Sequence, residues 1–321
     1  MAMQSWKSGY EATGAKMGYQ LCASFSTCSL ADAYLSKHCG VCNPNCALAT
    51  GKSVLGDTKV GISPSDPNLV DVLANIGGLQ WSVPGFAVDT AWMPKEVNLI
   101  WDNKATVPPA DGFPVAISAE QLFPVTEVDG RLHCRPVADV RNRLGISPES
   151  RIWLVSGAPD RVIEWMWVNP STTTSVLGHT RLELIMSPHV SMYGTQCPLH
   201  WRVSGKRTLI MYSEYRSVCA YSVPTISIPS VSFAEHWEGW LQENPAINCI
   251  CVNTQTWKSN SQFYPMVKLL AWFASRVRTD MHYIITGPVT PDRIELVRDV
   301  LPSCTIVSSF HYNRGRLGKA A

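Results

Sequence analysis

From about residue 66 onward, short apolar runs rich in β-branched residues alternate with segments that have the apolar period of an amphipathic helix. Short runs of this kind, bounded by turn residues, are typical of strands that are buried on both faces. The pattern predicts strands at Val97–Trp101, Pro114–Ile117, Arg151–Val155, Arg181–Met186, Val223–Ile228, Ile247–Val252, His282–Thr286 and Thr305–Val307. Strands that alternate with helices indicate a parallel sheet covered by helices.

The helices predicted between these strands include Pro67–Ile76, Val137–Leu144, Asp160–Trp167, Ser232–Glu243, Ser261–Arg278 and Pro291–Val300. Two of them have a recognisable start. Ser232 is expected to cap the helix that begins at Phe233, with Glu235 completing a capping box. Pro291 follows Thr290 at the other start, where its missing N–H costs nothing.

About eight strands interleaved with helices predict an α/β fold with a (β/α) barrel-like core. We expect irregularity between residues 78 and 150, where prolines and glycines are frequent. An open doubly wound sheet is the alternative. Residues 1–60 are polar and rich in glycine and cysteine, with little periodicity. We therefore expect a Cys-rich metal-binding extension at residues 1–60 and a barrel-like domain at residues 61–321.

Composition adds few constraints on function. The 321 residues are 45% hydrophobic and 16% charged, as in a globular protein, and the net charge of +2 favours neither nucleic acid nor membrane as a partner. The first residues lack an apolar signal-peptide core, and no apolar run approaches the ~20 residues of a membrane helix. We expect a cytoplasmic protein without membrane contact, in which eleven cysteines do not form a disulfide framework.

Five cysteines lie close together near the start of the chain, and they are the strongest chemical signal: Cys22, Cys28, Cys39, Cys42 and Cys46. Thiolates that converge at about 2.3 Å bind soft metal ions, and a C-x2-C pair wraps one ion because the turn directs both sulfurs inward. The structural zinc pattern has two separated pairs, whereas three close cysteines with a remote fourth are nearer to cluster-binding patterns. We predict an iron–sulfur cluster or zinc, with free buried cysteines as the first alternative and disulfides as the second.

Polar residues follow several predicted strands, where the chemistry of barrels and open α/β sheets is found. The residues at these positions are mostly small and include few acids. Ser187 and His189 follow one strand, and Asn253 and Gln255 follow another. Such a set is suited to hydrogen-bonding a polar ligand. The best general acid–base candidates are His189 and Asp102, and Glu214 is a third.

Two further segments suggest contact with a base or a nucleic acid. In the stretch NTQTW, Asn253 and Gln255 are able to read an amide edge, and Trp257 is able to stack on a planar ligand. A capped strand end with a core tryptophan is the alternative. In the C-terminal stretch FHYNRGRLGKAA, Arg314 and Arg316 are candidates for phosphate contacts, and a solvated tail is the alternative.

Several familiar motifs are missing from the chain. The TGKS stretch lacks the glycine of a phosphate-binding loop, and no GxGxxG, HExxH or GxSxG occurs. Nucleotide-triphosphate hydrolysis, dinucleotide binding, zincin proteolysis and the α/β-hydrolase triad therefore lose support. Cys249 and Cys251 form a CxC within an apolar strand, and we interpret them as packing residues.

The stretch MSPHVSMYGTQCPLHW, followed by YSEYRSVCAYSVPTISIPSVSF, CICVNTQTW and YIITGPVTPDRI, resembles an uncharacterised family of phage and mobile-element proteins with a barrel-like α/β core. The resemblance covers roughly residues 150–300 and implies the fold and a phage-type origin. The family often has Asp where this chain has His189, and the cysteine array lies outside the resemblance. A weaker likeness is to barrel enzymes that exchange a nucleobase in tRNA or DNA, whose acid and zinc motifs are missing here.

The leading hypothesis is therefore a metal-centre α/β-barrel enzyme that acts on a nucleobase or nucleic acid. The alternative is a non-enzymatic phage-type binding protein or host modulator whose metal only folds the first sixty residues, since a structural metal contributes folding energy directly.

Overall fold

The computed structural model describes residues 69–100, 114–128, 131–155, 157–192, 198–255, 257, 259–287 and 290–309, and the backbone of 52–53 and 56–59. The expected boundary near residue 60 lies outside these ranges. The chain divides into two compact units. One includes residues 69–82, 198–207 and 228–237, and the other includes residues 83–190, 208–227 and 238–309.

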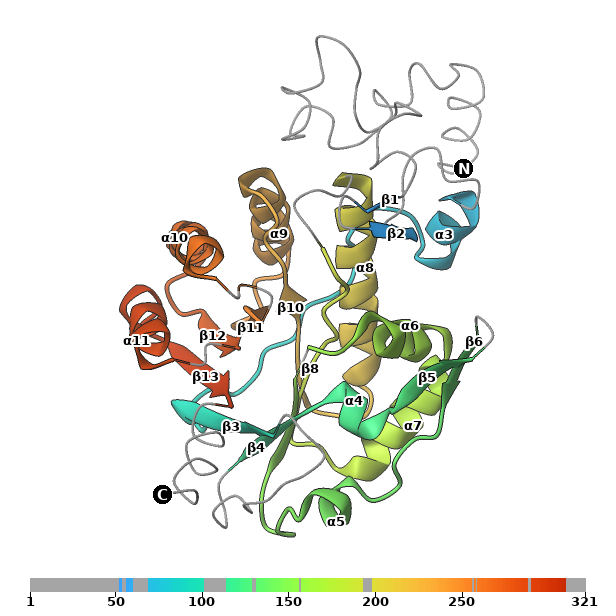
Figure 1. Cartoon of the computed structure of the whole chain (residues 1–321). Coiled ribbons are helices and arrows are strands. Elements are labelled where there is room, and N and C mark those ends of the chain that lie inside the picture. Colours follow the sequence, from blue (N-terminus) through green and yellow to red (C-terminus); the bar gives the residue numbers. More distant parts are fainter. Residues whose placement is uncertain are drawn as a thin grey trace, which may run out of the picture. The chain divides into compact units, whose positions relative to one another are not determined.

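The larger unit contains a parallel sheet in which strand order follows chain order. Its strands are β3 (Glu96–Ile100), β4 (Val115–Ser118), β7 (Ile152–Val155), β8 (Leu184–Met186), β9 (Tyr221–Val223), β10 (Thr225–Ile226), β11 (Cys249–Asn253), β12 (His282–Thr286) and β13 (Cys304–Ser308). The order β10-β11-β12-β13-β3-β4-β7-β8-β9 brings the last strand of the chain beside the first, because β13 pairs with β3. Figure 1 shows this curved sheet with α10 and α11 outside β12 and β13.

Pro224 alone separates β9 from β10, the two strands at the ends of this order. The Val223 carbonyl accepts a hydrogen bond from the Ser187 N–H at 2.9 Å, and the Pro224 carbonyl accepts one from the Cys251 N–H at 2.9 Å. The segment around Pro224 therefore bonds to β8 on one side and to β11 on the other. The sheet is a nearly closed barrel, as the sequence predicts, and the open doubly wound alternative is wrong.

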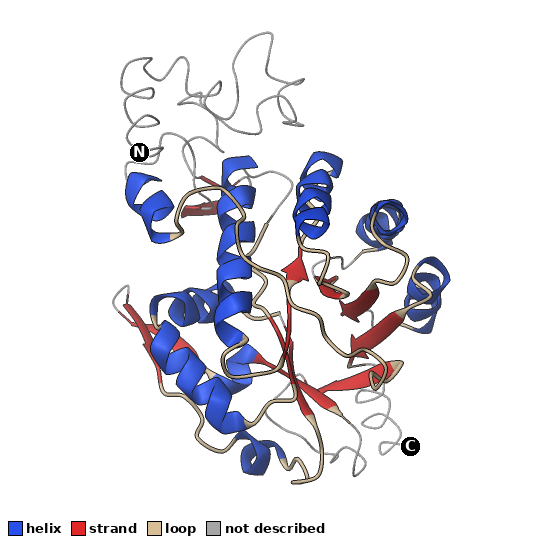
Figure 2. Ribbon diagram, turned by 180° about the vertical axis from the view of Figure 1, so that it is seen from behind, coloured by secondary structure: helices blue, strands red, loops and turns tan. Residues whose placement is uncertain are grey.

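The strands are followed by helices, shown in blue in Figure 2. In the barrel unit these are α4 (Ala119–Leu122), α5 (Val140–Leu144), α6 (Asp160–Val168), α7 (Pro170–Thr180), α10 (Asn260–Arg276) and α11 (Pro291–Val300). Two long helices, α8 (Pro198–Tyr215) and α9 (Val231–Glu243), have residues in both units. A hairpin of β5 (Val125–Val128) and β6 (Arg131–Cys134) follows α4.

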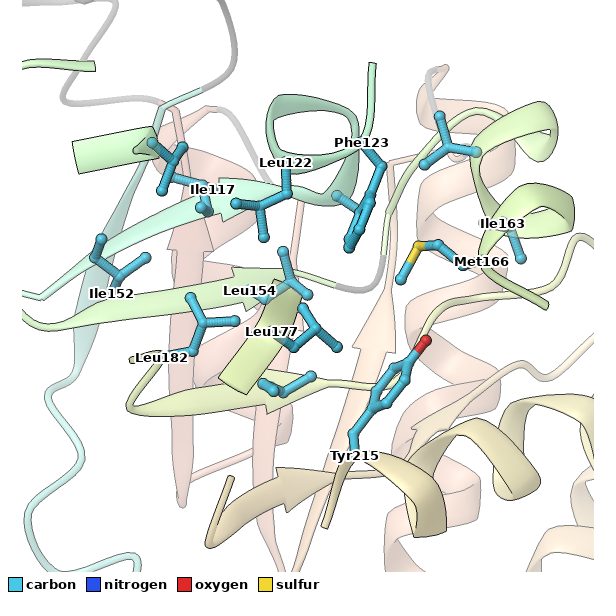
Figure 3. Packing of buried hydrophobic residues seen from close by; sticks show 14 of the residues in the cluster. Ile117, Leu122, Phe123, Ile152, Leu154, Ile163, Met166, Leu177, Leu182 and Tyr215 are labelled. Carbon is cyan, nitrogen blue, oxygen red and sulfur yellow. The ribbon is translucent and has the colours of Figure 1, made fainter. Parts of the chain in front are cut away.

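Two hydrophobic cores result from the alternation of side chains along the strands. Ile117 and Leu154 point outward and pack with Phe123, Met166 and other residues of the surrounding helices (Figure 3). Their neighbours point inward and fill the lumen, which contains Val97, Leu99, Ala116, Trp153, Val155, Leu184, Met186, Val223, Cys249, Cys251, Ile284 and Val307. Cys249 and Cys251 are thus packing residues, as expected.

The segment before β3 covers the end of the barrel where the strands begin. Val88 packs in the lumen core, and its N–H and carbonyl bond to the Asn248 side chain at 2.9 and 2.8 Å. Trp92 packs edge-on against Trp153, with ring centroids 5.7 Å apart, and against Tyr221 at 5.2 Å. Aromatic and amide contacts therefore close this end, and the polar strand ends are left at the other.

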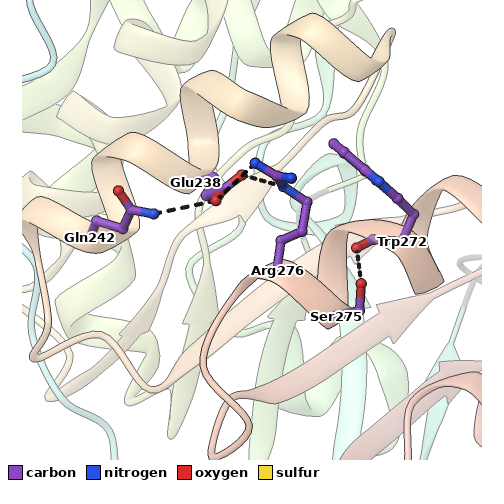
Figure 4. Close-up of polar contacts among 5 residues, drawn as sticks. All are labelled: Glu238, Gln242, Trp272, Ser275 and Arg276. Atoms are coloured by element: carbon purple, nitrogen blue, oxygen red, sulfur yellow. Dashed lines mark hydrogen bonds and ion pairs between the residues drawn. The ribbon is translucent and has the colours of Figure 1, made fainter.

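One surface network links α9 and α10 (Figure 4). Arg276 donates to both carboxylate oxygens of Glu238, at 2.7 and 3.3 Å, and Gln242 donates to the same carboxylate at 3.3 Å. The Arg276 guanidinium also lies 5.0 Å from the centre of the Trp272 ring. Because the pair is partly exposed, its contribution to stability is about 1 kcal/mol or less.

Trp81 makes the main aromatic contacts described in the smaller unit. It contains α3 (Leu69–Asn75) and an antiparallel pair of β1 (Lys52–Ser53) and β2 (Gly56–Lys59). The Trp81 ring packs on Trp237 at a centroid distance of 4.5 Å and on Phe233 at 5.7 Å. A Cβ at Gly205 would lie 2.5 Å from the Trp81 ring, so only glycine permits this close approach.

The start of α9 differs from the prediction. The helix begins at Val231, and the Ser230 hydroxyl, not that of Ser232, accepts the hydrogen bond from the Phe233 N–H at 3.2 Å. Ser232 instead bonds to the Ser230 hydroxyl at 3.0 Å. The predicted start of α11 at Pro291, after Thr290, is confirmed.

Candidate site at the carboxyl end of the barrel

Two neighbouring strands of the barrel end in inward-facing polar residues. Asn253 ends β11 and Thr286 ends β12, and the two are partners in the strand register. Cys251 and Ile284, two residues earlier, lie in the lumen, so Asn253 and Thr286 extend the same inward row. The barrel therefore places an amide and a hydroxyl side by side at the end where barrel enzymes carry their chemistry.

His189 joins this pair from the segment that follows β8. Its Nδ1 lies 3.5 Å from the Asn253 Nδ2. Its Nε2 has no accessible surface and, among the described residues, no hydrogen-bond partner, although part of the side chain reaches the surface. Burial lowers the pKa of the imidazole to about 4, and the negative charge of Asp160 opposes this shift. The ring is therefore neutral at physiological pH.

Gln255, at the same end of the barrel, packs closely against Gly157 and Gly287. Its backbone N–H donates to the Asn253 Oδ1 at 2.9 Å. A Cβ at Gly157 would lie 2.2 Å from the Gln255 Oε1, and one at Gly287 would lie 2.7 Å from the Gln255 backbone nitrogen. The loops after β7 and β12 carry glycine at these positions because a larger residue would displace Gln255.

Thr286 is the residue that the sequence pattern does not single out. Its side chain is completely buried, and its Oγ1 has no partner among the described residues. The backbone carbonyl of Thr286, by contrast, accepts from both the N–H and the hydroxyl of Thr254, at 2.8 and 2.9 Å. The sequence signal that could have identified Thr286 is a polar residue at the last inward-facing position of a strand whose interior is apolar.

Two other candidates have structural contacts instead. The Ser187 hydroxyl accepts from the Thr225 N–H at 2.9 Å and is fully buried, so it joins β8 to β10. Trp257 packs edge-on against Phe263 at 6.2 Å, and its carbonyl accepts from Arg293 at 3.2 Å. These contacts favour the packing interpretation of Trp257.

Glu214 does not join the site. It lies near the end of α8, a short turn before β9 begins at Tyr221, and therefore near the amino ends of the strands. Burial raises the pKa of its carboxyl group. The chain order thus places Glu214 near the opposite end of the barrel from His189, which follows β8.

The remaining candidates lie outside the described residues: Asp102, Arg314, Arg316, Cys22, Cys28, Cys39, Cys42 and Cys46. Within the described ranges, no group of three or more His, Cys, Asp or Glu side chains is placed to hold a metal ion. A metal bound by this chain through such a group would therefore depend on residues outside those ranges, among which the N-terminal cysteines are the candidates.

An open depression of about 650 Å³ lies elsewhere in the barrel unit, lined by Ser171, Thr174, Ser175, Gly178, His179, Arg181, Ser217 and Val218. Arg181 precedes β8 and Ser217 precedes β9, so the depression lies near the amino ends of the strands. Most of its lining is exposed to solvent. The buried polar atoms at the other end are the stronger indication of a site.

Comparison with known proteins adds no assignment. The chain matches no protein-family model and no curated protein. The resemblance to phage and mobile-element proteins therefore stays a prediction. None of the described helices is both long enough and apolar enough to cross a bilayer.

The low pKa of His189 gives a pH dependence of stability. Its folded pKa of about 4 lies below the ordinary value of 6.5, so the unfolded chain binds the proton more readily between these values. We expect the free energy of unfolding to fall as pH is lowered from about 6.5 to about 4, by on the order of 1–3 kcal/mol. Urea unfolding at pH 4.5 and 7.5 measures this.

The lowered pKa values of His236 and His282, which are also caused by burial, act in the same direction, so a variant has to isolate His189. His189→Gln is expected to reduce the difference between the two pH values. His179→Gln, a change at an exposed position on α7, is the control and is expected to leave it unchanged. Equal pH dependence in wild type and His189→Gln would contradict the assignment.

Proposed function

We propose that the protein is a barrel enzyme that acts on a nucleobase or nucleic acid, with the reacting base held at the carboxyl end of the barrel. The observation that carries this proposal is the cluster of the partly buried His189 with the buried Asn253 and Thr286. Two polar atoms of this cluster, the His189 Nε2 and the Thr286 Oγ1, have no partner among the described residues. Buried polar groups are normally hydrogen-bonded, so a ligand or water is the natural partner.

The chemistry of the cluster supports a base in particular. The side chains are neutral donors and acceptors, and amide side chains such as Asn253 and Gln255 hydrogen-bond to the edges of bases. Enzymes that modify a base enclose it in a pocket and read the hydrogen-bonding groups at its edge. In this proposal Asn253 and Gln255 orient the base and His189 is the proton-carrying group at the reacting atom.

We further propose that cysteines 22, 28, 39, 42 and 46 supply the ligands of an iron–sulfur cluster or a zinc ion. The three close cysteines of HCGVCNPNC are the support for this part. No step at His189 depends on the metal. The metal would fold the N-terminal segment or, with an open coordination position, take part in the reaction.

Ligand titration tests the base site. We expect one or more of adenine, guanine, cytosine, uracil and their nucleosides to bind in calorimetric titrations. His189→Gln and Asn253→Ala are each expected to weaken that binding about tenfold or more, since each removes a buried hydrogen-bonding partner. His179→Gln is the control. No binding by any base, nucleoside or short single-stranded oligonucleotide would overturn the proposal, as would unchanged affinity in both site variants.

The alternative is a non-enzymatic binding protein with a structural metal. Anaerobic purification followed by iron, sulfide and zinc analysis separates the two. Cys39→Ser with Cys42→Ser is expected to lose the metal. If this variant still binds the base but no longer converts it, the metal is catalytic. If the variant loses only the folded structure of residues 1–60, the alternative is supported. Metal-free wild-type protein with unchanged folding overturns the metal site.

A further inference from the structure

The hydrogen bonds around Asn253 fix the orientation of its side-chain amide. The backbone N–H of Gln255 donates to the Asn253 Oδ1 at 2.9 Å. If the amide were turned over, its NH2 group would face this N–H, and two donors would meet in a buried site. The Asn253 Nδ2 therefore points at the His189 Nδ1, 3.5 Å away.

This orientation decides which ring nitrogen of His189 carries the proton. An amide NH2 group only donates, so the His189 Nδ1 that faces it has to be the acceptor. The contact is long for a hydrogen bond, but a proton on Nδ1 would set two donors against each other. A neutral imidazole with an unprotonated Nδ1 carries its hydrogen on Nε2. Among the described residues, the exposed carboxylate of Asp160 raises the pKa of the His189 ring, but by less than burial lowers it.

Thr286, on the strand next to that of Asn253, carries a second buried polar atom. Its Oγ1 is completely buried, and Asn253 is its register partner on the adjacent strand. Its carbonyl is already used by Thr254, whereas its hydroxyl has no partner among the described residues. Each buried donor without a partner costs about 1–3 kcal/mol. One such donor on Thr286, the register partner of Asn253, and one on His189, whose Nδ1 faces Asn253, indicate a position that a ligand atom completes.

We propose that Asn253 holds His189 as the neutral tautomer with its proton on Nε2, and that this N–H and the Thr286 hydroxyl donate to one acceptor oxygen or nitrogen of the ligand. This inference rests on the proposed function for its ligand and on the contacts of Asn253 for its tautomer. His189 then acts as a hydrogen-bond donor, because no lone pair on Nε2 faces the ligand. Donors arranged in advance in this way stabilise negative charge that develops on a carbonyl oxygen. Toward His189, Asn253 is a positioning residue in addition to its proposed contact with the base, and Thr286 is a further binding residue.

The tautomer is measurable without any ligand. Protein labelled with ¹⁵N-histidine is studied by long-range ¹H–¹⁵N correlation spectra at pH 7, and His189→Gln identifies the signals of His189. We expect the ¹⁵N chemical shift of Nδ1 to be that of an unprotonated ring nitrogen, and the ¹⁵N chemical shift of Nε2 to be that of a protonated one. A proton on Nδ1, or a doubly protonated ring at pH 7, would overturn the inference.

Asn253→Asp gives the matched test of positioning. A carboxylate in place of the amide accepts a hydrogen bond, so the proton is expected to move to the His189 Nδ1, and the pKa of the ring is expected to rise. An unchanged tautomer in folded Asn253→Asp protein would show that Asn253 does not position the ring. Should this variant fail to fold, the spectrum of the wild-type protein still decides the tautomer.

The ligand half is tested with a base that binds in the titrations above. Thr286→Val is expected to weaken its binding roughly tenfold, whereas Thr286→Ser, which keeps the hydroxyl, is expected to bind nearly as well as wild type. Equal loss in both variants would overturn the role of the hydroxyl. A correct tautomer in a protein that binds no base would refute the proposed function alone, and a wrong tautomer in a protein that binds a base would refute this inference alone.

Discussion

Replacing Trp153 with alanine is expected to lower the free energy of unfolding by about 3–5 kcal/mol, the usual cost of removing a large buried aromatic side chain. Trp153 is fully buried in the lumen of the barrel. Its ring packs edge-on against Trp92, and its Nε1 donates to the Glu183 carboxylate at 3.0 Å. The change leaves a cavity where β7 meets the segment that covers this end, and it removes a donor from Glu183, which also pairs with Arg151 at 3.3 Å.

Urea unfolding followed by circular dichroism measures this loss. Trp153→Phe keeps part of the packing and is expected to cost less than alanine. Val168→Ala, at a position that is 65% exposed on α6, is the control, and it is expected to change stability by about 0.5 kcal/mol or less. A Trp153→Ala protein as stable as the Val168 control would mean that the lumen does not support the barrel.

The barrel is predictable from the sequence because its strands leave a clear local signal. Each strand is a short apolar run buried on both faces, and the turn residues between runs mark where it ends. Each of the eight predicted strands overlaps a strand of the structure, and the predicted run Val223–Ile228 contains β10 and only the last residue of β9. Closure is not local, because it depends on the pairing of β13 with β3 across most of the chain.

Besides the single-turn helix α4, the pattern misses two longer described helices, for opposite physical reasons. Helix α7, PSTTTSVLGHT, is mostly polar, so it lacks an apolar face with a helical period. Helix α8 is buried along most of its length, so polar and apolar residues do not alternate with a helical period. The capping residue of α9 is missed because Ser230 and Ser232 are chemically equivalent, and only the backbone path decides that Ser230 accepts the bond from Phe233.

The candidate site is predictable only in part. His189, Asn253 and Gln255 follow predicted strands, and a barrel brings the residues at the ends of its strands to one end. Ser187 satisfies the same rule, yet its hydroxyl bonds to the backbone of β10. Thr286 is hidden because it belongs to the strand itself. Glu214 shows the reverse case, since the sequence offers it as an acid–base candidate but the chain order places it near the amino ends of the strands.

Replacing Gly287 with alanine is expected to lower the free energy of unfolding by roughly 2–5 kcal/mol, because two costs add. The backbone of Gly287 has φ +110°, which a residue with a Cβ rarely adopts. The added Cβ would also lie 2.7 Å from the backbone nitrogen and 3.0 Å from the Cα of Gln255. Backbone atoms do not rotate away as the end of a side chain does, so the loop that carries Gln255 has to move.

Gly239→Ala is the matched control for this change. Gly239 lies in α9, has nothing within 4 Å of the added Cβ and adopts no left-handed backbone conformation. Alanine there is expected to stabilise the protein by about 0.5–1 kcal/mol, because it has the higher helix propensity. The same glycine-to-alanine change thus has opposite signs at the two positions. Because Gln255 also donates to Asn253, we expect Gly287→Ala to weaken base binding and to disturb the His189 tautomer, whereas Gly239→Ala does neither. Equal stability and equal affinity in the two variants would show that Gln255 is not held in place by the close approach of Gly287.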